Sequence, residues 1–71
     1  METEGVMLKE YRIAWINELG FYNVVEFDTF NDANTAFYIL ADGSQNIMVA
    51  MMRKRHEGTW INEKVTYKQM H

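Results

Sequence analysis

The absence of cysteine most constrains this chain, because a chain of only 71 residues must fold without covalent support. A domain of this size buries about 60% of the surface that its unfolded chain exposes, so its core is marginal. Disulfides, metal ions and oligomerisation are the usual additional supports. Without cysteine there is neither a disulfide nor a thiolate ligand, and His56 and His71 are too far apart in sequence to suggest zinc. We therefore expect no metal or cofactor, and either self-association or an efficient core.

The length predicts a single domain over residues 1–71, with residues 1–4 flexible. The first ten residues, METEGVMLKE, are acidic and lack the apolar stretch of a signal peptide. No run of about 18 apolar residues could form a membrane span. These features predict a cytoplasmic protein without a membrane partner. Acidic residues concentrate before residue 46 and basic residues after it, a division that can indicate a charged partner or head-to-tail self-association.

Residues 5–19, GVMLKEYRIAWINEL, predict an amphipathic helix, because the following apolar residues recur at helical spacing: Leu8, Tyr11, Trp15 and Leu19. Gly20 supplies a left-handed residue that can end a helix, with Phe21 folding back on the last turn. Ile13 does not fit the apolar stripe. We expect it to be exposed or pressed against a loop.

After Gly20 the apolar period changes to two, which predicts strands at 23–30, 35–41, 45–55 and 59–68. Asp42–Gly43 predicts a two-residue hairpin turn, and His56–Gly58 predicts a three-residue loop with Gly58 in a left-handed conformation. The predicted fold is α+β, with one N-terminal helix packed on a four-stranded antiparallel β-meander.

An alternative places a second short helix at about 30–41, beside a three-stranded sheet. The spacing of five apolar residues suits it: Phe30, Ala33, Phe37, Leu40 and Ala41. The asparagines and the FYIL segment favour a strand by propensity.

Alternation along residues 59–68 places Trp60 on the same face as Lys64 and Lys68, opposite an apolar face that contains Ile61, Val65 and Tyr67. The two predicted turns then extend this assignment to the preceding strands, with Ile47, Val49 and Met51 on the core side. The predicted outer, partner-binding face consists of Phe37, Ile39, Met48, Met52, Lys54, Trp60, Lys64 and Lys68, with Ala50 among them.

An apolar patch with charged residues at its rim usually marks a binding site, and aromatic residues and methionine are enriched in interfaces. We therefore expect a non-enzymatic interaction or regulatory protein that binds a partner protein or a second copy of itself, with Trp60 as the energetic centre. In size, lack of cysteine and predicted layout, the chain resembles small phage-encoded accessory proteins. That resemblance rests on no motif, and it implies an accessory or inhibitor role.

A second hypothesis is weak nucleic-acid binding, because cations that neutralise phosphates lie near an aromatic ring that can stack on bases. The residues concerned are Arg53, Arg55, Trp60, Lys64 and Lys68. Catalytic motifs are absent. Ser44, the only serine, lies in a predicted turn with no histidine in reach, so we expect neither an enzyme nor a small-molecule substrate.

Overall fold

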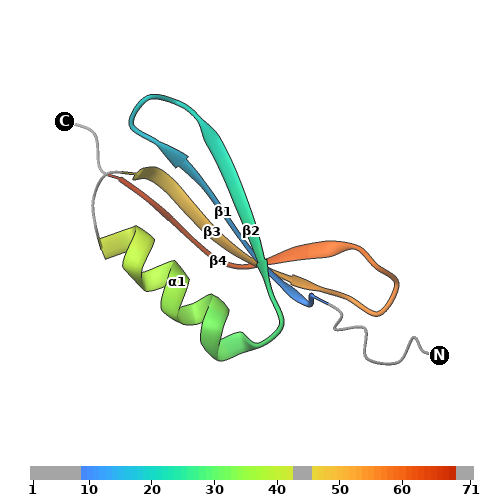
Figure 1. The fold of residues 1–71 in the computed structure, drawn as a ribbon. Coiled ribbons are helices and arrows are strands. Elements are labelled where there is room, and N and C mark those ends of the chain that lie inside the picture. Colours follow the sequence, from blue (N-terminus) through green and yellow to red (C-terminus); the bar gives the residue numbers. More distant parts are fainter. Residues whose placement is uncertain (1–8, 43–45, 69–71) are drawn as a thin grey trace.

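A computed structural model describes residues 9–42 and 46–68 as a sheet with a helix on one face (Figure 1). The elements are β1 (Tyr11–Asn17), β2 (Tyr22–Phe27), α1 (Phe30–Asp42), β3 (Asn46–Lys54) and β4 (Trp60–Tyr67). The four strands are ordered β2-β1-β3-β4, and each pairs antiparallel with its neighbours. This arrangement confirms the α+β class with one helix and four antiparallel strands. The prediction of an N-terminal helix is wrong, because the helix lies between β2 and β3.

Strand β1 replaces the described part of the predicted helix, and residues 1–8 lie outside the described residues. β1 is a central strand, with β2 on one side and β3 on the other. On both faces of β1, side chains lie beside apolar residues of the neighbouring strands, because Ile13 pairs with Val25 and Met51 and Ala14 pairs with Val24 and Ala50. Apolar residues therefore occur on both faces of β1, which weakens the alternation expected of a half-exposed strand. Ile13, the residue outside the predicted helical stripe, is fully buried in the core.

A tight turn joins β1 to β2, where the sequence suggested the end of a helix. Gly20 has a φ of 89°, so it is left-handed as predicted, but within a hairpin. The Asn17 side-chain oxygen accepts hydrogen bonds from the backbone N–H groups of Leu19 and Phe21, at 2.9 and 3.0 Å. Phe21 is exposed instead of folding back on a helix.

Helix α1 corresponds to the alternative reading of residues 30–41, so the predicted strand over 35–41 is wrong. Thr29 begins the helix: its hydroxyl accepts a hydrogen bond from the Asp32 N–H at 3.2 Å, and its carbonyl accepts one from Ala33. Ala33 and Phe37 are buried against the sheet. This packing outweighs the strand propensity of the FYIL segment. The predicted Asp42–Gly43 hairpin is also wrong, because Asp42 is helical and β3 pairs with β1; Gly43 itself lies outside the described residues.

The connection through α1 makes the sheet different from the predicted meander. β2 and β3 both lie antiparallel to β1 and on opposite sides of it, so they run parallel to each other. The chain therefore leaves the edge strand β2, crosses one face of the sheet as α1, and returns beside β1. The expected three-stranded sheet of the alternative is also not formed, because β1 supplies a fourth strand.

The core lies between α1 and the sheet, mainly against β1 and β3. Its five buried residues are Ile13, Ala33, Phe37, Val49 and Met51. Partly buried side chains such as Trp15, Phe27 and Leu40 surround them. Because one helix covers one face, the opposite face of the sheet has no second layer among the described residues.

The β3–β4 hairpin has the predicted loop. The Arg55 N–H donates to the Thr59 carbonyl at 2.8 Å, the Gly58 N–H donates to the Arg55 carbonyl at 2.9 Å, and Gly58 has a φ of 95°. Beyond the loop the register shifts, since Met51 pairs with Lys64 but Met52 pairs with Asn62.

Glu63 is therefore an extra residue in β4, a β-bulge that changes the face of every residue after it. Val65 pairs with Ala50 and Tyr67 with Met48, which places both on the face away from α1. The prediction that Val65 and Tyr67 face the core with Ile61 is wrong for these two residues.

We predict that Phe37→Ala lowers the free energy of unfolding by about 3–5 kcal/mol, because it removes a buried ring beneath the helix. Ile39→Ala, a control on the exposed side of the same helix, should change it by less than about 0.5 kcal/mol. Urea unfolding followed by circular dichroism measures both. Should Phe37→Ala be unfolded without denaturant, Phe37→Leu should still cost about 1 kcal/mol or more. Equal effects at the two positions would contradict this packing.

Candidate binding surface

The face of the sheet opposite α1, here called the open face, is built from alternate residues of all four strands. No described element covers it (Figure 1). The pairing registers assign to it Arg12, Ala14 and Ile16 of β1, Tyr22, Val24 and Glu26 of β2, Met48, Ala50, Met52 and Lys54 of β3, and Trp60, Asn62, Val65 and Tyr67 of β4.

Two neighbouring rows of the open face contain no charged side chain. One row crosses the sheet as Val24, Ala14, Ala50 and Val65, and the next as Tyr22, Ile16, Met48 and Tyr67. Both alanines are buried, although no described helix lies above them. At the two edges of the second row, Tyr22 is 61% exposed and Tyr67 is 71% exposed. The result is an apolar surface that spans the whole sheet.

Charged side chains on the open face lie beyond these rows, near the β3–β4 hairpin. The Arg12 guanidinium stacks 4.1 Å from the ring centroid of Trp60, and its Nη2 donates to a Glu26 carboxylate oxygen at 2.6 Å. The Lys54 ammonium lies 5.8 Å from the same ring. Because Glu26, Arg12 and Trp60 belong to β2, β1 and β4, these contacts connect three strands. Trp60 is half-buried, with Arg12 against its ring.

The structure gathers four of the eight predicted partner-binding residues on the open face: Met48, Met52, Lys54 and Trp60. It does not place Phe37 or Ile39 there, because both belong to α1; Phe37 is in the core and Ile39 is exposed on the helix.

The predicted lysines of β4 are also displaced from the open face. Lys64 lies on the helix side as a result of the bulge, where its ammonium donates to Asn34 and to the Tyr38 hydroxyl. Lys68 follows the end of β4 and forms an ion pair with Glu18 at 3.2 Å.

The residues of the nucleic-acid hypothesis do not form one patch. Arg53 pairs with Ile61 on the helix side and bonds Glu63, whereas Trp60 is on the open face. The hydrogen bond and the charge of Glu63 raise the pKa of Arg53 above its ordinary value, so Arg53 stays cationic but already has a carboxylate partner.

Five of the seven lysine and arginine residues have a carboxylate within 4.0 Å: Lys9, Arg12, Arg53, Arg55 and Lys68. Paired cations attract a phosphate backbone less strongly than free ones do. The separated and paired cations therefore do not form a continuous basic surface, which is the feature typical of nucleic-acid-binding domains.

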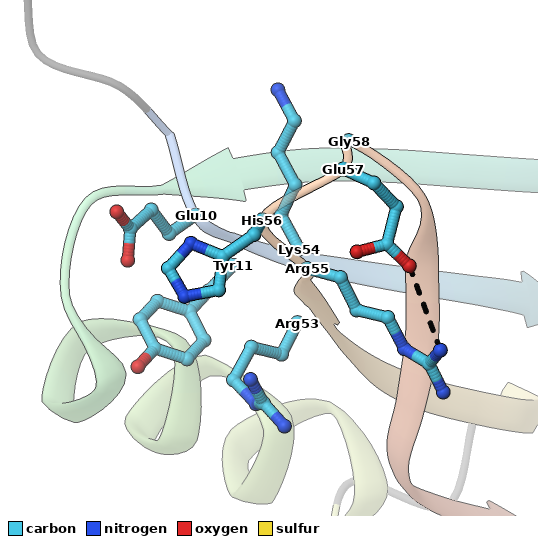
Figure 2. A pocket seen from close by; sticks show the side chains of 8 residues that line it. All are labelled: Glu10, Tyr11, Arg53, Lys54, Arg55, His56, Glu57 and Gly58. Atoms are coloured by element: carbon cyan, nitrogen blue, oxygen red, sulfur yellow. Dashed lines mark ion pairs between the residues drawn. The ribbon is translucent and has the colours of Figure 1, made fainter.

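A hollow with a volume of about 710 Å³ lies at the β3–β4 hairpin (Figure 2). It is lined by Glu10, Tyr11, Arg53, Lys54, Arg55, His56, Glu57 and Gly58. Figure 2 shows Arg55 reaching back to Glu57, an ion pair of 3.6 Å. Most of these side chains are exposed. The hollow is open to water, so it does not shield its contents from solvent as a closed active site does.

A comparison of the chain with protein-family models, with curated proteins and with solved structures gives no match. Across residues 9–42 and 46–68, no group of three histidine, aspartate or glutamate side chains could hold a metal ion. The helix of this same part of the chain is not long and apolar enough to cross a membrane.

Sequence reasoning missed the β1 and β2 half of the open face, including Arg12, Ile16, Tyr22 and Val24. The sequence signal for this half is the two-residue spacing of Arg12, Ala14 and Ile16, which is typical of one face of a strand. The prediction of a helix over residues 5–19 leaves this spacing unused. It also missed Val65 and Tyr67, since a bulge changes faces without any marker in the sequence.

We predict an energetic coupling between Arg12 and Trp60 of about 0.5–2 kcal/mol, because the guanidinium stacks on the ring at a partly buried position. A double-mutant cycle with Arg12→Gln, Trp60→Leu and the combined variant measures it through urea unfolding. The same cycle between Arg55 and Trp60 serves as the control and should give no coupling. Additive effects at Arg12 and Trp60 would show that the stacking does not stabilise the fold.

Proposed function

We propose that this chain is a non-enzymatic interaction protein whose open face docks on an apolar surface of a partner protein. The observation that carries the proposal is the pair of charge-free rows that crosses all four strands, with Tyr22 and Tyr67 mostly exposed at its edges. Small proteins rarely expose a contiguous apolar surface without a partner for it. The composition of the rows, tyrosine, methionine and aliphatic residues, suits the centre of an interface.

The side chains around the rows support a directional contact. Tyr67 and Tyr22 can anchor the interface, since large aromatic side chains contribute most of the binding energy at interfaces. Lys54 lies at the hairpin end of the same face, and the Arg12–Glu26 pair lies between it and the rows. An acidic group on the partner opposite Lys54 would fix the orientation of the complex, since charges at the rim select the partner more than they add affinity.

The proposal keeps the function expected from the sequence and changes the residues that perform it. The proposed docking surface consists of residues of β1, β2, β3 and β4 and includes none of α1. If the surface of the partner that the open face covers contains the functional site of the partner, the chain would act as a regulator or inhibitor of that partner. The proposal includes the cytoplasmic location that is expected from the sequence.

We predict that a photoreactive p-benzoylphenylalanine at position 67 crosslinks a partner protein in the cell that makes the chain, whereas the same residue at position 38 does not. Tyr67 and Tyr38 form a matched pair, because both are exposed tyrosines, 71% and 55%, on the open face and on α1 respectively. Mass spectrometry of the crosslinked species identifies the partner. Adding Met48→Asp, which places a charge beside position 67, should reduce the crosslink at least tenfold.

Equal crosslinking from positions 67 and 38, or crosslinking from position 38 alone, would show that the open face is not the docking surface. Circular dichroism of each variant verifies that the exchange has not unfolded the chain.

A further inference from the structure

The two edges of the sheet differ in how they are protected from pairing with another strand. β4, one edge, contains the bulge at Glu63 and the charges of Glu63 and Lys64. Bulges and charged side chains are common means of preventing an edge strand from pairing further. β2, the other edge, pairs with β1 from Tyr22 to Phe27 without a register shift, and Glu26 is its only charged residue.

Both faces of β2 are also poorly covered. The consecutive residues Val24 and Val25 are 45% and 44% exposed, although they point to opposite faces. α1 packs mainly on β3 and β1, so it leaves Val25 accessible. Flat, apolar and unprotected edges are the strands that pair with a further strand.

The hydrogen bonds of β2 show which of its backbone groups are not used in pairing with another described strand. The Asn17 N–H donates to the Phe21 carbonyl, which makes these two residues a bonded pair. Hydrogen-bonded and non-hydrogen-bonded residue pairs alternate along an antiparallel ladder. The backbone groups of Asn23, Val25 and Phe27 therefore form hydrogen bonds with β1. The N–H and C=O groups of Tyr22, Val24 and Glu26 therefore point outward, away from the sheet.

We propose that β2 pairs antiparallel with β2 of a second copy of this chain, around a two-fold axis that is perpendicular to the sheet and passes midway between the two Val24 residues. In this register Val24 faces Val24 of the second copy, and Tyr22 faces Glu26. All three residues with outward backbone groups then form bonded pairs, which gives about six hydrogen bonds between the copies.

The side chains fit this register as well as the backbone does. Residues that face each other lie on the same face of the sheet, and no charge lies opposite a like charge, which would be unfavourable. The Tyr22 hydroxyl can donate to the Glu26 carboxylate of the second copy. If the second β2 strand is shifted by two residues toward Glu26, the two-fold axis lies between the two Val25 residues and Tyr22 has no partner within β2. If it is shifted by four residues, the two Glu26 carboxylates face each other. In the register centred on Val24, all outward N–H and C=O groups of β2 form hydrogen bonds, and no two like charges face each other.

The pairing would produce a continuous sheet of eight strands with both helices on one side. The axis is perpendicular to the sheet, so the open faces of the two copies would lie side by side on the other side. This goes beyond the proposed docking function, since the edge contact joins the copies and leaves both open faces free for a partner.

The absence of cysteine permits a direct test, because a single introduced cysteine has no competing thiol. Val24→Cys should give a covalent dimer under mild oxidation, since Cα atoms of a bonded pair lie about 5.5 Å apart, within disulfide range. Glu26→Cys should not, because the two cysteines would be about 13 Å apart along the strands. A mixture of Tyr22→Cys and Glu26→Cys chains should again crosslink.

Sedimentation equilibrium provides a second test that needs no crosslink. The unmodified chain should approach twice its 8.4 kDa mass as concentration rises. Val24→Lys and Val24→Asp should each remain monomeric, because each places like charges together on the axis, and an equimolar mixture of the two should dimerise.

A monomer at concentrations up to about 1 mM would overturn the inference, as would a dimer that crosslinks through Val65→Cys on β4 but not through Val24→Cys. Neither experiment involves another protein, so its failure would leave the docking proposal intact. Absence of a partner crosslink from position 67 would likewise leave the β2 pairing intact.

Discussion

The packing of one helix against one face of the sheet is the constraint on which the other features of this protein depend. Ala33 and Phe37 of α1 meet Ile13 of β1 and Val49 and Met51 of β3, and these five residues form the buried core. The described residues offer no second helix, so the opposite face keeps its apolar residues without cover. The core and the candidate surface are therefore two results of the same arrangement.

The route of the chain determines which strands are exposed. Because α1 carries the chain from β2 over the sheet to β3, β1 becomes central and β2 becomes an edge. The Arg12 side chain crosses this arrangement on the open face, between Glu26 of β2 and Trp60 of β4. β1 thus supports β2 on one side, while no described strand pairs with its other edge, beside which two valines are exposed.

The sequence predicted those parts of the fold that local chemistry controls. The left-handed Gly58 and the hairpin between Arg55 and Thr59 follow from turn geometry, and the structure contains both. Alternation across that hairpin also places Met48, Met52 and Trp60 on one face. The helical spacing of Phe30, Ala33 and Phe37 also predicts α1, whereas the strand propensity of the FYIL segment argues against a helix there.

The remaining features depend on contacts between distant segments, which a single sequence does not show. A central strand with apolar residues on both faces resembles a helix in pattern, so the sequence predicts a helix where β1 lies and does not show its half of the open face. Ile13 gave the one local warning, because a fully buried residue had no place in the helical interpretation. The bulge at Glu63 has no sequence marker, and it moved Lys64 and Tyr67 to the faces opposite those expected.

Solvent accessibility of the methionine methyl groups tests most directly whether α1 covers one face and leaves the other free. In a sample with ¹³C-labelled methionine methyls, a soluble paramagnetic agent should broaden the Met48 and Met52 signals strongly. The Met51 methyl should be protected and show a nuclear Overhauser effect to the Phe37 ring. Protection of Met48 and Met52 equal to that of Met51, with contacts from them to α1, would contradict the account.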